Sequence, residues 1–163
     1  MSKLKMTLIA AACLLSAGAA SAATPWDVFK RFGLTGNWSP DCSSPPSATN
    51  YWMTYKEGPG GKVVRPLNRG GGDELSVTVD SAAMVSSTTV SARFRNDDPT
   101  WGDTNGTAVD LTLELVNDRV HTIDSTGMDG TQYIKDGIVV KSGKPIPWIQ
   151  KCGQTKPAPT SPN

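Results

Sequence analysis

Residues 33–42 read GLTGNWSPDC, and residues 145–152 read PIPWIQKC. Each segment carries one Trp and one Cys, and most of the chain between them shows the alternation typical of β-strands. Cys42 and Cys152 form an even pair, which in an exported chain predicts a disulfide. Closing a loop of about 100 residues is worth about 4.7 kcal/mol in the chain-entropy model. The two segments are therefore predicted to meet and to close a small β-barrel or sandwich.

The start of the chain predicts export. Two lysines precede a short apolar core (residues 6–15), and small residues then lead to an A-x-A cleavage site at 20–22. Residues 1–23 are expected to be a signal peptide, cleaved after Ala22 or Ala23, which predicts a periplasmic or secreted protein. The apolar run is shorter than the roughly 20 residues that span a bilayer, so no membrane span is expected. The alternative is lipidation at Cys13, although the three alanines before it lack the Leu that such signals carry.

Length and charge limit the classes of function. Residues 24–153 are long enough for one domain with a single core, and residues 154–163, which contain three prolines, are predicted to be a disordered tail. The chain has 16 Lys and Arg against 15 Asp and Glu. Removing the two signal lysines leaves 14 − 15 = −1, which argues against nucleic-acid binding through bulk charge. Abundant Thr, Ser, Gly and Val indicate an all-β protein with short strands.

Alternating side chains locate the strands and their inward faces. Four such sets are predicted to share one interior: Tyr51, Met53, Tyr55; Leu75, Val77, Val79; Val90, Ala92, Phe94; and Leu111, Leu113, Leu115. About eight strands joined by short hairpins form an antiparallel meander, whose edges are hidden by closure into a barrel or sandwich. The segment 25–33 predicts a short helix with Trp26, Phe29 and Phe32 on one face. We expect this helix to plug one end of the core; the alternative is an arm that binds a partner.

No catalytic group is predicted. His121 is the single His, and counting outward from the turn Asn117-Asp118 places it opposite Glu114. Both are expected on the polar face, as an exposed pair without a catalytic role. The loop 96–106 is rich in Asp but lacks the EF-hand spacing, so a calcium site is the less favoured interpretation. The chain is therefore expected to be no enzyme and to use no metal and no cofactor.

The Gly-x-Trp at residues 36–38, preceded by a short helical turn, resembles the opening of the lipocalin and calycin families. The resemblance implies an eight-stranded barrel whose Trp closes the base and whose cavity holds a small apolar ligand. In that family a basic residue of the last strand packs on the Trp, and Lys151 is the nearest candidate here. The first strand departs from the family by breaking at Pro40. The same opening also resembles small periplasmic protease inhibitors built on eight-stranded barrels, in which the N-terminal arm carries the function.

These patterns together predict an exported binding module with a barrel cavity for a small apolar or amphipathic ligand. The tyrosines would be polar handles in an otherwise apolar interior, because a buried phenol needs a hydrogen-bond partner. The alternative is a protein-binding, inhibitor-like or structural envelope protein without a ligand. The candidate ligand-binding residues are Trp38, Tyr51, Met53, Tyr55, Phe94 and Leu113.

Overall fold

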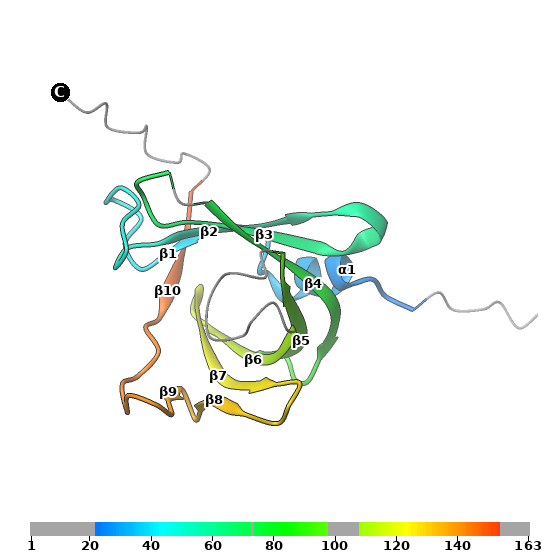
Figure 1. Cartoon of the computed structure of the whole chain (residues 1–163). Coiled ribbons are helices and arrows are strands. Elements are labelled where there is room, and N and C mark those ends of the chain that lie inside the picture. The colour runs from blue at the N-terminus through cyan, green and yellow to red at the C-terminus, as the bar shows by residue number, and fades with distance from the viewer. Residues whose placement is uncertain (1–21, 73, 98–107, 154–163) are drawn as a thin grey trace, which may run out of the picture.

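The strands form one antiparallel sheet that closes on itself. The structure is a computed structural model, and it describes residues 22–72, 74–97 and 108–153. The sheet order is β10-β1-β2-β3-β4-β5-β6-β7-β8-β9, with an additional pairing of β10 to β7. That pairing closes the ring from β10 through β7, so eight strands form a barrel and β8–β9 is a hairpin appended to β7 (Figure 1). The predicted all-β barrel is confirmed.

The described residues form one α-helix, one 3₁₀ turn and ten strands. They are α1 (Pro25–Phe32), β1 (Gly36–Ser39), β2 (Trp52–Glu57), the 3₁₀ turn η1 (Pro59–Gly61), β3 (Val63–Asn68), β4 (Glu74–Met84), β5 (Thr89–Asn96), β6 (Ala108–Val116), β7 (Arg119–Gly127), β8 (Gln132–Lys135), β9 (Ile138–Val139) and β10 (Ile149–Cys152). Residues 1–21 of the predicted signal peptide, residues 98–107 in and after the predicted Asp-rich loop, and the predicted tail from 154 lie outside the described residues.

Both ends of helix α1 are capped. Thr24 accepts a hydrogen bond from the Asp27 backbone N–H, and the Asp27 carboxylate accepts in return from the Thr24 backbone N–H. Such a reciprocal capping box satisfies N–H groups that the first turn leaves unpaired. Gly33 ends the helix with φ 87°, a left-handed conformation that suits glycine. None of the helices in the described ranges has the length and apolarity needed to cross a membrane.

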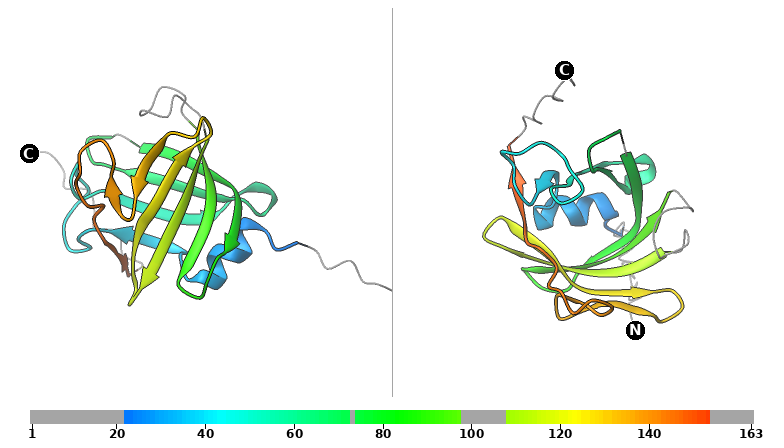
Figure 2. Two further views of the ribbon diagram at one scale, coloured as in Figure 1. Left: turned by 90° about the horizontal axis from the view of Figure 1, so that it is seen from below. Right: turned by 60° about the vertical axis from the view of Figure 1, so that its left-hand side comes forward.

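The helix closes one end of the barrel, as predicted (Figure 2). Phe29 and Phe32 are buried, and Trp26 packs partly buried against the same core. The Phe29 ring centre lies 5.4 Å from that of Tyr55 and 6.3 Å from that of Phe94. These distances lie in the range of favourable tilted aromatic pairs. The three rings form an aromatic layer that floors the barrel interior.

The seam that closes the barrel is short. β10 pairs with β7 through two residue pairs, Ile149–Val120 and Gln150–Arg119. On its other side β10 pairs with β1 through three, from Asn37–Cys152 to Ser39–Gln150. The disulfide Cys42–Cys152 reinforces this second side, with Cα atoms 5.4 Å apart. The predicted disulfide is thus confirmed, and it holds β10 to the start of the barrel.

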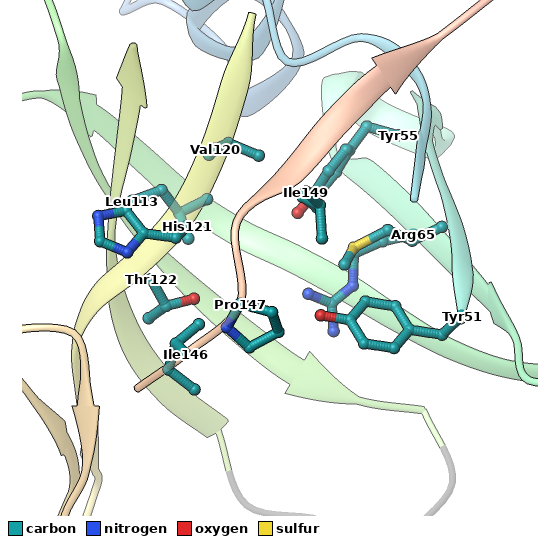
Figure 3. Close-up of a pocket in the computed structure, with 11 residues that line it drawn as sticks. Tyr51, Tyr55, Arg65, Leu113, Val120, His121, Thr122, Ile146, Pro147 and Ile149 are labelled. Atoms are coloured by element: carbon teal, nitrogen blue, oxygen red, sulfur yellow. The ribbon is translucent and has the colours of Figure 1, made fainter. Parts of the chain in front are cut away.

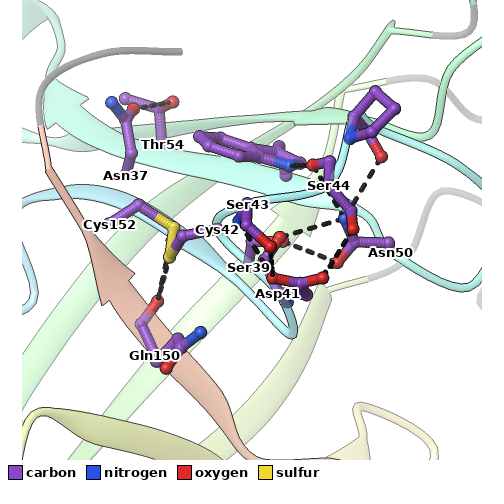
Figure 4. The surroundings of a disulfide bond; sticks show 12 residues. Asn37, Ser39, Asp41, Cys42, Ser43, Ser44, Asn50, Thr54, Gln150 and Cys152 are labelled. Carbon is purple, nitrogen blue, oxygen red and sulfur yellow. Dashed lines mark hydrogen bonds between the residues drawn. A yellow bond between two sulfur atoms is a disulfide. The ribbon is translucent and has the colours of Figure 1, made fainter. Parts of the chain in front are cut away.

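The outer face next to the disulfide carries a feature that alternation did not predict. Alternation places Trp52 on the face of β2 opposite Met53 and Tyr55, yet it is buried. The loop 40–50 folds over it, and the indole N–H donates to the Ser44 carbonyl at 3.1 Å (Figure 4). Asn50 holds the loop in shape, because its amide donates to the carbonyls of Asp41, Ser44 and Pro45. A polar, Pro-rich loop therefore buries a Trp outside the barrel.

Candidate functional site: a hollow in the barrel interior

A hollow of about 410 Å³ opens into the barrel between β2–β3 and β7, beside the segment that leads into β10. A smaller pocket of about 40 Å³ continues it inward and shares six of its lining residues. Tyr55 lies on the helix side of β2, and Tyr51 precedes it by four residues, or about 13 Å along an extended chain. The hollow is therefore at the end of the barrel away from α1. The residues common to both parts are Tyr51, Met53, Arg65, Thr122, Ile146 and Pro147 (Figure 3).

The structure brings four of the six candidate residues to this site. Tyr51, Met53, Tyr55 and Leu113 line the pocket. Trp38 and Phe94 are not among the lining residues. Trp38 is fully buried, and its indole N–H donates to the Leu34 carbonyl at 2.9 Å.

Phe94 is kept from the hollow by the residues packed on it. It belongs to the aromatic layer under Phe29, and the guanidinium carbon of Arg65 lies 5.0 Å from its ring centre. Phe94 therefore packs beneath Arg65 and does not line the pocket, whereas Arg65 does.

Arg65 is the functional candidate that the sequence analysis missed. On β3 it lies between Val63 and Leu67, both buried, and therefore on the strand's inward face. Its Nε is buried and has no hydrogen-bond partner in the described part of the chain. The signal was present in the sequence, since Val-x-Arg-x-Leu places one arginine on an otherwise apolar face.

The remaining polar groups of the hollow are few and carry positive or no charge. Tyr51 and Thr122 contribute hydroxyls, and the exposed Arg69 lies at the rim. Burial raises the pKa of the Tyr51 phenol and nearby Tyr55 adds to this, while the positive charge of Arg65 acts in the opposite direction. Tyr51 therefore keeps its proton at neutral pH and is a hydrogen-bond donor. No Asp or Glu is among the described residues that line either part.

The predicted opposition of Glu114 and His121 is confirmed, and His121 also lines the smaller pocket. His121 Nε2 and the Glu114 carboxylate are 3.1 Å apart. The prediction that the pair is exposed is wrong for the imidazole, whose side chain is 13% exposed. Trp148 stacks on it with ring centres 3.7 Å apart, and the turn at Gly137 packs beside it. The segment leading into β10 thus uses His121 as a packing surface.

Lys151 packs near Trp38 across the β1–β10 pairing. From β10 its Nζ lies 5.7 Å from the Trp38 ring centre. Comparisons of the chain with protein-family models, with curated proteins and with solved structures gave no match. What the structure shows is an eight-stranded antiparallel barrel with one disulfide.

Proposed function

We propose that the protein is a binding module that holds a small, largely apolar ligand in the open end of its barrel. The observation that carries this proposal is the hollow of about 410 Å³. Small-molecule sites typically measure about 300–1,000 Å³ and combine apolar walls with a few polar groups. Met53, Leu67, Ile146 and Pro147 supply the apolar walls, and Tyr51 and Thr122 supply hydroxyls.

The fold supports this proposal by its division into a closed and an open end. Helix α1 and the aromatic layer fill the closed end, so a ligand would enter from the other side. An N-terminal arm that binds a protein would need its aromatic face free. Phe29 and Phe32 instead pack into the core, which favours the cavity over the inhibitor-like alternative.

The disulfide indicates an oxidising compartment outside the cytoplasm. We place the binding function there, in the periplasm or in the secreted fraction. The proposed role is non-catalytic, a carrier or receptor for a small molecule.

The test uses an uncharged, environment-sensitive naphthylamine dye and the oxidised protein. We expect binding with a dissociation constant on the order of 1 µM, about −8 kcal/mol. Thr122→Trp fills the hollow from β7 and should weaken binding at least tenfold. Thr112→Trp adds the same bulk on the polar side of β6, away from the lining residues, and should bind as the wild type does. Absence of dye binding to the folded wild type would overturn the proposal.

A further inference from the structure

We infer that the ligand of this hollow is an amphipathic acid, a largely apolar molecule with a carboxylate or similar anionic group that pairs with Arg65. This inference rests on the proposed function and names the class of ligand. Its basis is Arg65, a positive charge on the inward face of β3 with no carboxylate among the described residues that line the hollow.

An arginine keeps its positive charge under all physiological conditions. Burying such a charge without a partner costs several kcal/mol, which is why buried charges are normally paired. Arg65 as a whole is partly exposed, but its Nε is buried and unpartnered, and the described residues around the hollow include no carboxylate. The outer wall shows the contrast, because Arg93 and Arg95 bond there to Asp110 and Asp80.

The contact between Arg65 and Phe94 offsets only part of this cost. A cation over an aromatic ring gains a weak attraction that does not replace a full counter-charge. The contact does explain the position of the guanidinium, since the ring holds it against the aromatic floor. The arginine is thereby kept in place at the inner part of the hollow.

The groups around Arg65 suit an anion that bears an apolar body. The Tyr51 phenol lies near Arg65, whose positive charge acts on its pKa (Figure 3). It is protonated at neutral pH and is therefore a second hydrogen-bond donor in the hollow. Arg69 adds a positive charge at the rim, where it favours the entry of anions. Leu67, Ile146 and Pro147 form the apolar wall that would cover the ligand's body. Guanidinium groups bind carboxylates through two parallel hydrogen bonds, which gives geometric selectivity.

The experiment compares a fluorescent acid with its own methyl ester, 11-(dansylamino)undecanoic acid and the ester, on the oxidised full-length protein. The two probes share size and apolar surface and differ in the charge. The wild type should bind the acid at least tenfold more tightly than the ester at pH 7.5. Raising the salt concentration should narrow the difference, because Arg65 is partly exposed and dissolved ions screen its charge.

Substitutions then assign the preference to one residue. Arg65→Met should weaken acid binding about tenfold or more and leave ester binding within twofold of the wild type. Arg65→Lys keeps the charge and should retain part of the preference. Arg93→Met removes a cation from the outer wall and should change neither affinity.

The outcomes separate the two proposals. Equal binding of acid and ester by the wild type would overturn the acid ligand and leave the binding module standing. Binding of neither probe would overturn the proposed function. If the acid preference persists in a folded Arg65→Met protein, the assignment to Arg65 is wrong. The wild-type comparison decides the ligand class even if that variant does not fold.

Discussion

The Nζ atom of Lys151 lies 5.7 Å from the ring centre of Trp38 and donates a 2.9 Å hydrogen bond to the carbonyl of Gly33. One side chain of the last strand thus joins the first strand to the residue that ends the helix. Trp38 adds a second link, because its own N–H donates to the Leu34 carbonyl. The two contacts fix the base of the barrel to the chain that enters it.

Lys151→Met should lower the free energy of unfolding by about 1 kcal/mol. It removes a cation–π contact and a hydrogen bond to a backbone carbonyl, each worth about 0.5–1 kcal/mol at an exposed site. Urea denaturation followed by Trp fluorescence measures the change. The exposed Lys141 is the control, and Lys141→Met should stay within about 0.5 kcal/mol of the wild type. Equal effects of the two substitutions would show that the Lys151 contacts add nothing to stability.

His121 and Trp148 should stabilise the fold as a coupled pair. The stack covers the imidazole, so His121→Ala should cost about 1–2 kcal/mol, more than an exposed residue would. Trp148→Ala should cost at least as much. A double-mutant cycle in urea should give a coupling energy of about 0.5–1.5 kcal/mol. Additivity of the two single effects would contradict a stabilising contact.

Asp80 should make the stability depend on pH in the acid range. Hydrogen bonds from Arg95 and then from Lys62 lower the pKa of its carboxyl from 3.8 to about 2. The folded protein therefore binds fewer protons than the unfolded chain between these values. The stabilisation is present in full above about pH 4 and is lost as the pH falls towards 2.

Asp80→Asn tests this at two pH values. At pH 7 it should lower the free energy of unfolding by about 1 kcal/mol, a modest value because its partners are partly exposed. At pH 2 the variant and the wild type should differ little, because the wild-type carboxyl is then about half protonated and most of the stabilisation by its charge is lost. A difference that is the same at both pH values would show that the charge of Asp80 is not its cause.

Local patterns predicted the parts of the fold that local interactions decide. Asn117 and Asp118 have φ of 51° and 56°, as a two-residue hairpin turn requires, and the turn sets the register that places Glu114 opposite His121. The inward-facing residues of each strand followed from the alternation of side chains between its two faces. The cysteine pair predicted the long-range contact that joins the ends of the barrel.

Contacts between segments far apart in sequence could not be predicted in this way. No periodicity shows that the loop 40–50 covers Trp52 or that Trp148 covers His121, because both covers come from irregular chain. Two of the six candidate residues line neither the hollow nor the smaller pocket, again because of contacts between distant segments. Trp38 and Phe94 do face inward, but the helix and Arg65 fill the space next to them.

The barrel is closed by β10, which follows the other barrel strands in the sequence. The pairing of β10 with β1 joins segments far apart in the chain, since their cysteines, Cys42 and Cys152, are 110 residues apart in sequence. Contacts of such long range form slowly. Until β10 arrives, β1 and the start of β7 are open edges at which a second copy of the chain could add a strand. The covalent link changes this risk after folding, because a β10 that has detached remains tethered beside β1. Oxidation of the cysteines should therefore act against aggregation as well as unfolding.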